Sequence, residues 1–470
     1  MRRSAAGWRP RLGRGGVRRV VCGLFFFPRG GSAQVARALG RTFVQAGWEL
    51  TLAAGSLGQQ GEQTHAGTFF AGLDVVGVDY SQERKEPVPF QPSYEDRPGA
   101  PDRVFADVDD EAYERLVEVW VDALDRAGVE RADVLHLHHL TPANEAASRA
   151  FPAVPVVGQL HGTELALLRA IGTGAPVSWR FAERWRERMR GWAQGCARLI
   201  VPPAAAGEVV YLLDAAPGSV VELPSGVELD LFGCAPLALG QRLAFWRRWL
   251  VEQPLGWDEG GVPGSVAYTD ADLWPFRQAQ AIALYVGRFT AVKRLPLLIR
   301  SHAETATRLS RPLPLVLVGG SPGEWEGEHP LTVARAVGDE QLFLAGWRAH
   351  QELPAALNAA DLLVLPSVAE AFGLVLVEAM ACGVPVIAAD SHGPAQIVAP
   401  ETGWLVPADD PQALTEALFA AASDGDERRR RGEHAYRHSS GYAWPLVADR
   451  VAEIYEQLSG GRDAERAAGL

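Results

Sequence analysis

Short apolar runs alternate along the chain with segments whose apolar residues have helical spacing. Apolar runs bounded by glycine, proline and polar residues are typical of buried strands. A strand followed by a glycine loop, a helix and a second strand is the opening of a parallel α/β sheet. The predicted strands are 17–27, 49–53, 75–78, 134–138, 154–160, 199–201, 220–223, 281–286, 315–318, 342–347, 361–365, 385–389 and 403–407.

The predicted strands fall into two groups, and 470 residues are enough for two domains with their own cores. Between the groups lies a stretch with a tryptophan-rich amphipathic helix (239–251), which either shapes one side of a functional site or bridges the domains. The expected divisions are a disordered basic leader (1–16), a first Rossmann-like domain (17–223), an interdomain segment with an insertion (224–280), a second Rossmann-like domain (281–440), and a C-terminal helix and tail (441–470).

Composition argues against several classes of function. The formal net charge of −12 does not suit general nucleic-acid binding, which needs a basic surface. No apolar run approaches the roughly 20 residues of a membrane-spanning helix. The four cysteines are scattered without a C-x-x-C pair, which favours a reduced protein in the cytoplasm.

The first 19 residues contain seven arginines and no acidic residue, and a short apolar segment follows them. This segment lacks a small-residue cleavage site, so a strand after a basic leader is favoured over a signal peptide. A peripheral contact of the leader with anionic lipid on the cytoplasmic face stays open. A basic aromatic helix at 179–192 could also lie on a membrane, but its interspersed glutamates favour a core-facing helix.

Two carboxylates mark the stretch from Val364 to Val386. Glu370 lies on the loop after a buried strand, and Glu378 lies eight positions later on a helix that ends at Gly383. Amides of the first helical turn can meet negative charge, helped by the helix dipole. Without further context, one capping and one solvated glutamate would be the better interpretation of this spacing.

Two cations follow the strand 281–286. Arg288 and Lys293 lie five positions apart on the loop that leads to a helix. A guanidinium and an ammonium so placed can clamp adjacent phosphates, the first through two hydrogen bonds and the second as a point charge. Taken alone, they would be read as two solvated cations.

These residues stand in motifs that resemble those of the family four retaining glycosyltransferases, which have the GT-B fold. The stretch 364–386 resembles P-S-x-x-E-x-F-G-L-x-x-x-E-A-M-A-x-G-x-P-V. The two cations resemble G-R-x-x-x-x-K-G, with Arg294 in place of the last glycine, and the segment from His161 to Glu164 resembles H-G-[TS]-[DE]. The resemblance is strong over 281–408 and moderate before residue 201, and residues 234–280 depart from it.

The resemblance implies two Rossmann-like domains that face a central cleft, with a C-terminal helix that crosses back to the N-terminal domain. Glu378 would hold the ribose, the two cations would neutralise the diphosphate, and Glu370 with the amides of the helix N-terminus would grip the sugar. Gly30-Gly31 is not a dinucleotide fingerprint and by itself is a tight turn. The residues assigned to the donor are Gly30, Gly31, Arg288, Lys293, Trp347, Glu370, Phe372, Gly373, Leu374 and Glu378, and those assigned to catalysis are His161, Arg288, Lys293 and Glu370.

No metal or other cofactor is expected. Two cations and a helix N-terminus are available for the leaving group. The acidic residues at 107–110 precede a helix, where N-terminal capping explains them. His136, His138 and His139 lie on a strand with alternating faces and have no carboxylate companion at ligand spacing.

The predicted function is the metal-independent transfer of a sugar from a nucleoside diphosphate sugar, such as a UDP-sugar, to a hydroxyl of a glycan, a lipid or a small molecule. The resemblance implies retention of configuration by front-face attack. The sequence leaves the sugar, the base and the acceptor open. Alternatives are a nucleotide-sugar epimerase of the same fold, a phosphorylase with lysine-held pyridoxal phosphate, and a non-catalytic protein that binds sugar nucleotides.

Overall fold

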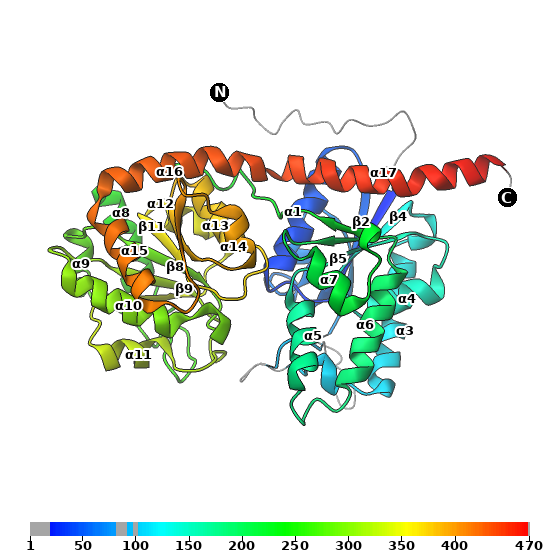
Figure 1. Cartoon of the computed structure of the whole chain (residues 1–470), viewed down its shortest axis with the longest axis horizontal. Helices are drawn as coiled ribbons and strands as arrows, with labels where there is room; N and C mark the ends of the chain where they lie inside the picture. The colour runs from blue at the N-terminus through cyan, green and yellow to red at the C-terminus, as the bar shows by residue number, and fades with distance from the viewer. Residues whose placement is uncertain (1–18, 81–91, 97–101, 469–470) are drawn as a thin grey trace. The chain divides into compact units, whose positions relative to one another are not determined.

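The computed structural model describes residues 19–80, 92–96 and 102–468, and it divides into two compact units (Figure 1). The first unit holds the described residues up to Gly226 together with the C-terminal segment from Trp444. The second unit holds Val227–Ala443. The predicted basic leader at 1–16 lies outside the described residues.

The first unit is built on a parallel sheet with the order β3-β2-β1-β4-β5-β6-β7 among the described residues. Its central strands are buried on both faces, which explains why their sequences are apolar throughout. The strands are β1 (Arg19–Leu24), β2 (Glu49–Ser56), β3 (Asp74–Asp79), β4 (Val134–His138), β5 (Val156–Gln159), β6 (Arg198–Val201) and β7 (Val220–Glu222).

The second unit is built on another parallel sheet, with the order β10-β9-β8-β11-β12-β13. The two sheets confirm the prediction of two Rossmann-like α/β units. The strands are β8 (Ala283–Gly287), β9 (Leu315–Gly319), β10 (Leu342–Gly346), β11 (Leu362–Leu365), β12 (Val386–Ala389) and β13 (Gly403–Val406).

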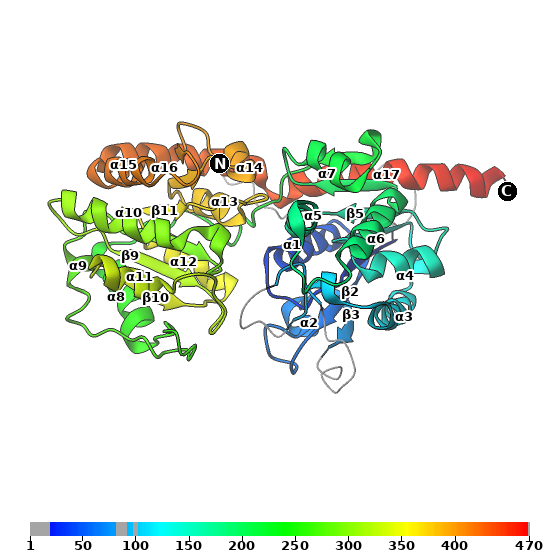
Figure 2. The same ribbon diagram turned by 60° about the horizontal axis from the view of Figure 1, so that its bottom comes forward.

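Helices cover both sheets. In the first unit α3, α4 and α6 pack together (Figure 1), and in the second α15 and α16 lie side by side (Figure 2). The helices of the first unit are α1 (Gly31–Gln45), α2 (Ala66–Phe69), α3 (Asp110–Arg126), α4 (Pro142–Ala150), α5 (Thr163–Gly174), α6 (Ala182–Gly195), α7 (Ala206–Leu213) and α17 (Trp444–Ala468). Those of the second are α8 (Leu239–Arg247), α9 (Trp274–Arg277), α10 (Leu295–Arg308), α11 (Pro330–Val337), α12 (Leu353–Asn358), α13 (Leu374–Ala381), α14 (His392–Ile397), α15 (Pro411–Ser423) and α16 (Gly425–Ser439).

The last helix returns to the first unit, as predicted. Figure 1 shows α17 running along α1, and the two helices are in contact. Tyr455 of α17 stacks on Phe43 of α1 with ring centroids 5.5 Å apart. Its hydroxyl also bonds His136 Nδ1 on β4, so the helix is tied to the sheet by a buried polar contact as well as by packing.

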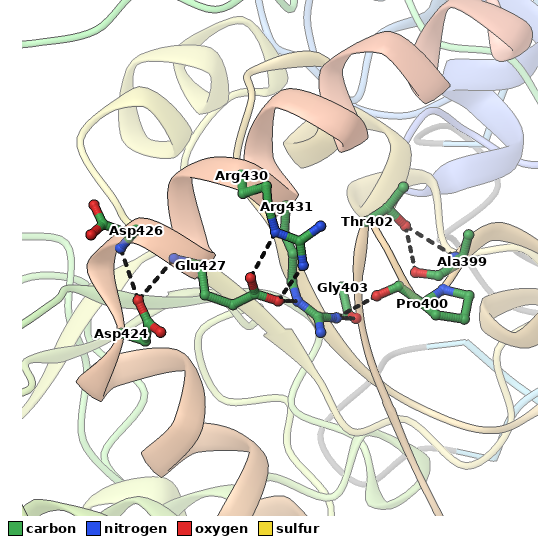
Figure 3. A network of polar contacts seen from close by, with 9 residues as sticks. All are labelled: Ala399, Pro400, Thr402, Gly403, Asp424, Asp426, Glu427, Arg430 and Arg431. Atoms are coloured by element: carbon green, nitrogen blue, oxygen red, sulfur yellow. Dashed lines mark hydrogen bonds and ion pairs between the residues drawn. The ribbon is translucent and has the colours of Figure 1, made fainter.

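A polar network fixes α16, the element that precedes this return (Figure 3). Asp424 caps the helix by accepting the amides of Asp426 and Glu427 at 3.0 and 2.9 Å. Glu427 accepts Arg431 Nε at 2.7 Å, and the same guanidinium donates to the carbonyl oxygens of Pro400 and Gly403. The side chain of Arg431 therefore joins α16 to the start of β13.

The segment predicted to lie between the domains, 224–280, belongs almost entirely to the second unit. Most of its aromatic side chains, including Trp246, Trp249 and Trp257, are part of that unit's core, whereas Trp274 is exposed. The amphipathic pattern of 239–251 shows that this helix buries one face, but it does not say against which sheet. The helical segment covers the predicted range, because α8 ends at Arg247 and a π-helical turn continues it to Glu252.

The basic aromatic helix is a core helix. In α6, Trp185, Met189 and Trp192 are buried, whereas Arg184 and Arg188 pair with Asp110. This result favours the core-facing interpretation over a helix that lies on a membrane. No described helix is both long and apolar enough to cross a bilayer.

Candidate active site

The order of strands in the second sheet brings the predicted donor residues together. From β8 the chain builds outward through β9 and β10, and then returns to the other side of β8 as β11. Loops that leave two such neighbouring strands run apart, and ligands of open α/β sheets bind at this switch point, at the carboxyl ends of the strands. Arg288 and Lys293 follow β8, and Glu370 follows β11.

An ion pair joins the two loops. Lys293 Nζ bonds Glu370 Oε2, and both side chains are largely buried, with 14% and 18% of their surfaces exposed. Beside the ion pair, the amide of Val368 donates to the carbonyl oxygen of Val292 at 3.0 Å. The structure thus places a cation and a carboxylate from segments 77 positions apart at one point.

Arg288 contacts the buried Tyr285 of β8 through its backbone. The hydroxyl of Tyr285 donates to the Arg288 carbonyl oxygen at 2.6 Å. Burial raises the pKa of Tyr285 well above its usual value, the negative charge of Glu370 raises it further, and the positive charge of Arg288 opposes both. The charges of Glu370 and Arg288 therefore both act on the pKa of the buried Tyr285 hydroxyl.

Arg294, which replaces the glycine of the resembled motif, adopts a left-handed backbone with φ of 55°. Such a conformation favours glycine, which explains the residue expected there. The Arg294 guanidinium forms two hydrogen bonds with Asp409, at 2.5 and 2.9 Å. This largely exposed ion pair offsets part of the free-energy cost of the left-handed backbone, and it keeps the Arg294 guanidinium directed towards Asp409.

The N-terminus of α13 follows the loop that carries Glu370. Gly373, the residue before the helix, has φ of 94°, a conformation in which a side chain would be strained. Phe372 is buried, and Leu374 is partly buried, so their side chains pack while their amides lie at the helix N-terminus. The amide of Gly393 donates to the Glu370 carbonyl oxygen at 3.0 Å, which fixes the loop carrying this carboxylate.

Glu378 is not a solvated helix residue. Only 6% of it is exposed, and its Oε1 accepts His350 Nε2 at 2.7 Å. Sequence reasoning missed His350. The signal that could have found it is its position just after the predicted strand 342–347, at the ligand end of the sheet.

Trp347 directly follows β10 and is 48% exposed. The glycine before it, Gly346, has φ of 69°. An exposed aromatic side chain at the carboxyl end of a strand agrees with the assignment to the donor, which nonetheless stays a prediction.

The remaining predicted residues lie in the first unit, where Gly30 and Gly31 follow β1 at the corresponding switch point between β1 and β4. Gly30 precedes α1, and Gly31 is the first residue of this helix. A Cβ built at Gly30 would have no atom within 4 Å, so the loop leaves room for a ligand to approach. His161 follows β5, directly before the left-handed Gly162 and α5.

His161 belongs to a cluster of histidines that the sequence did not assemble. Its Nε2 lies 3.1 Å from His138 Nδ1, and its ring lies 4.6 Å from that of His139. Glu164 accepts the His161 amide at 3.2 Å and lies 2.5 Å from His139 Nδ1. The sequence shows three histidines at the end of β4, but only the strand order shows that β4 lies beside β5 and therefore near His161.

The cluster defines the tautomer of His161. Burial is the first cause that lowers the pKa of both His138 and His161 well below the usual value, so both rings are neutral at pH 7. His138 Nε2 is buried without a hydrogen-bond partner among the described residues. At a buried nitrogen without a partner, an unprotonated lone pair costs less free energy than an N–H group that has no acceptor. His138 therefore carries its proton on Nδ1 and donates to His161 Nε2, which leaves the His161 proton on Nδ1.

The acidic residues before α3 serve local structure. Asp109 caps α3 by accepting the Ala112 amide at 2.9 Å, and Asp107 accepts Arg180 Nε at 2.7 Å. Within the described part of the chain, no group of three or more His, Cys, Asp or Glu side chains is arranged to hold a metal ion.

Comparison with solved structures defines the class of the fold. Sucrose-phosphate synthase from Thermosynechococcus elongatus matches 94% of this chain and 100% of its own, with a TM-score of 0.64 and 19% identity. HepE of Anabaena, solved with UDP-glucose, matches 93% and 99%, with a TM-score of 0.63 and 15% identity. The two parallel sheets with their returning helix are thus the GT-B architecture.

Comparison of sequences gives the family. The family model described as Glycosyltransferase Family 4 matches residues 29–231, and the one described as Glycosyl transferases group 1 matches residues 271–438. Together they cover most of the chain and leave 1–28, 232–270 and 439–470 unmatched. The chain belongs to the group 1, family four glycosyltransferases.

Curated relatives carry the name D-inositol 3-phosphate glycosyltransferase. One from Kineococcus radiotolerans is 32% identical over 278 residues, which are 56% of this chain and 57% of the relative. One from Catenulispora acidiphila is 29% identical over 354 residues, 72% of this chain and 76% of the relative. The chain spans about half the length of the first curated relatives it matches.

The histidine cluster makes the stability of the first unit depend on pH. Burial lowers the pKa of His136 to about 4 and shifts His138 and His161 in the same direction. Below the unfolded value of about 6.5, the unfolded chain therefore binds protons that the folded chain does not. The free energy of unfolding should fall as the pH is lowered from 7 to 5, by up to about 1.4 kcal/mol per pH unit for each such histidine.

Chemical denaturation between pH 7 and 5 measures this slope. His138→Asn should lose less stability over the window, because asparagine cannot take a proton there. His434→Asn, on α16 and outside the cluster, is the matched control. Equal slopes for wild type and His138→Asn would contradict this account of the cluster.

Proposed function

We propose that the chain transfers a sugar from a nucleoside diphosphate sugar to a hydroxyl acceptor, with retention of configuration and without a metal. The observation that carries the proposal is the ion pair of Lys293 and Glu370 at the switch point of the second sheet. Arg288 lies on the same loop as Lys293, and the N-terminus of α13 follows the loop of Glu370. Cations, a carboxylate and free helix amides in one place suit a ligand that joins a diphosphate to a polyhydroxyl ring.

The cations act on the leaving group. Negative charge builds on the diphosphate as the glycosidic bond breaks, so fixed positive charges stabilise the transition state more than the bound substrate. Lys293 already bonds Glu370, but an ammonium group has three donors and can hold a phosphate oxygen at the same time. The ion pair then keeps Lys293 in position before the donor arrives.

The carboxylates bind hydroxyl groups. Glu370 accepts hydroxyls of the transferred sugar, and Glu378 accepts the ribose diol. His350 orients Glu378 by its bond to Oε1, so the carboxylate enters the reaction already held in place. The family resemblance assigns His161 a polar contact with the transferred sugar, and its Nδ1–H is available once His138 occupies Nε2.

The retaining outcome rests on the family resemblance, in which the acceptor attacks on the face that the diphosphate leaves. We nominate no protein nucleophile. The two protein cations are what allows the diphosphate to leave without a divalent ion. Location in the cytoplasm stays a prediction.

The relatives suggest which substrates to test first. HepE is described in complex with UDP-glucose, which makes UDP-sugars the first donors. The name D-inositol 3-phosphate glycosyltransferase makes inositol 3-phosphate a first acceptor, beside unphosphorylated sugars and inositol. The order of this panel follows from these names.

The test of the function is the release of nucleoside diphosphate from a panel of UDP-, GDP- and ADP-sugars, with and without the acceptor panel. Release that depends on an acceptor is expected for at least one pair, and NMR of the product should show the anomeric configuration of the donor. Conversion of the donor sugar without release of nucleoside diphosphate would instead indicate an epimerase. Binding without any turnover would contradict the proposed transfer.

The two cations should be required for rate rather than for folding. Arg288→Ala and Lys293→Ala are each expected to lower kcat by at least ~10²-fold, because each removes a charge that faces the leaving group. Arg300→Ala removes a cation from α10 that forms an ion pair with Glu328, and it should leave kcat unchanged. Turnover at the wild-type rate in both site variants would refute their assignment.

Removal of divalent ions should not affect the reaction. Assays in excess EDTA are expected to give the same kcat as assays with Mg²⁺, because Arg288 and Lys293 neutralise the diphosphate. Loss of activity in EDTA that Mg²⁺ restores would overturn the metal-independent mechanism.

A further inference from the structure

Residues 249–268 cover the edge of the second sheet at its ligand end. They lie within the stretch that neither family model matches. β10 is the edge strand of this sheet, and its outer side faces these residues. The hydroxyl of Tyr268 accepts the Leu344 amide at 2.8 Å, and a Cβ at Gly256 would lie 2.5 Å from the Leu344 carbonyl oxygen. We call residues 249–268 the edge segment.

The edge segment also holds the loop that follows β10. Arg348 is buried, and its guanidinium donates to the carbonyl oxygens of Trp249 and Gln253, at 2.9 and 2.7 Å. Leu255 approaches so closely that a Cβ at Gly346 would overlap its carbonyl oxygen. Both contacts act on the residues immediately before and after Trp347.

The loop that Arg348 holds reaches Glu378, the carboxylate that the proposed function assigns to the ribose. His350, two residues after Arg348, bonds Glu378 at 2.7 Å. On its other side, the edge segment places Trp257 against Gly320 and stacks it on Phe289, with ring centroids 5.4 Å apart. Phe289 is the neighbour of Arg288. The edge segment thus contacts the loops after β8, β9 and β10 at the carboxyl ends of these strands.

We propose that the edge segment is a specificity determinant of the donor: it positions Trp347 and His350, and thereby sets which nucleoside the site accepts. This inference rests on the proposed function, since it assigns a base and a ribose to that site. A segment that only protected the edge of the sheet would stabilise the fold without distinguishing bases. The two roles are separable, because the base and the diphosphate are held by different loops.

Arg348→Met tests the coupling. We would measure the Kd of UDP, GDP, ADP and inorganic pyrophosphate by calorimetry, for the full chain. The preferred nucleoside diphosphate should bind at least ~10-fold more weakly, and the ratio between preferred and disfavoured bases should shrink. Pyrophosphate binding should change less than twofold, because Arg288 and Lys293 are untouched.

Tyr268→Phe is the second variant, since it removes only the hydroxyl bonded to Leu344 and keeps the ring in the core. It should shrink the ratio between bases in the same direction. Arg242→Met is the matched control. It also removes an arginine bonded to a carbonyl oxygen, that of Ala359, but at the opposite end of the sheet, before β11. Its ratio between bases should equal that of wild type.

The outcomes separate the two proposals. Wild type that binds neither pyrophosphate nor any nucleoside diphosphate would sink the proposed function and this inference with it. If wild type prefers one base, and folded Arg348→Met and Tyr268→Phe keep the same preference, the inference on the edge segment is wrong while the proposed function stands. A smaller preference in both variants, with pyrophosphate unchanged, would support it.

Discussion

The ion pair between Lys293 and Glu370 is the interaction on which the site depends. It joins the loops after β8 and β11, two neighbouring strands at the point where the second sheet reverses its direction of growth, so both loops begin at the same edge of the sheet. A largely buried cation needs a nearby opposite charge. In this position the partner is the Glu370 carboxylate, so one contact joins the loops after β8 and β11.

Other contacts hold this arrangement in place through close backbone packing. Gly373 provides the left-handed turn that starts α13, and the amide of Gly393 holds the backbone of Glu370 from α14. Glu378 is oriented from the loop after β10 by His350. The polar groups are therefore held in place by hydrogen bonds before a ligand binds, which is the condition for electrostatic stabilisation of a transition state.

The sequence predicted the two sheets well, because parallel strands covered on both faces leave continuous apolar runs. It also singled out Arg288, Lys293 and Glu370 as site residues, and the structure pairs two of them, Lys293 and Glu370. It could not predict contacts that depend on strand order. His138 and His161 are 23 positions apart at the ends of neighbouring strands, and His350 lies 28 positions before Glu378, whose helix α13 packs against α12.

The sequence interpretation set residues 224–280 apart as an interdomain segment, and in the structure residues 227–280 lie in the second unit. Amphipathic spacing showed that the helix near Trp246 buries one face, but only the structure shows that this face packs on the second sheet. The left-handed backbone of Arg294 was likewise invisible, since a residue other than glycine gives no sign of positive φ. In both cases the deciding information is a partner distant in sequence, such as Asp409 for Arg294.

A crystal structure of the chain with a bound nucleoside diphosphate would test the central claim most directly. The account predicts phosphate oxygens bonded to Arg288, Lys293 and the amides at the start of α13, with the ribose hydroxyls on Glu378. A nucleotide bound elsewhere on the chain, with Lys293 and Glu370 still paired only to each other, would contradict it.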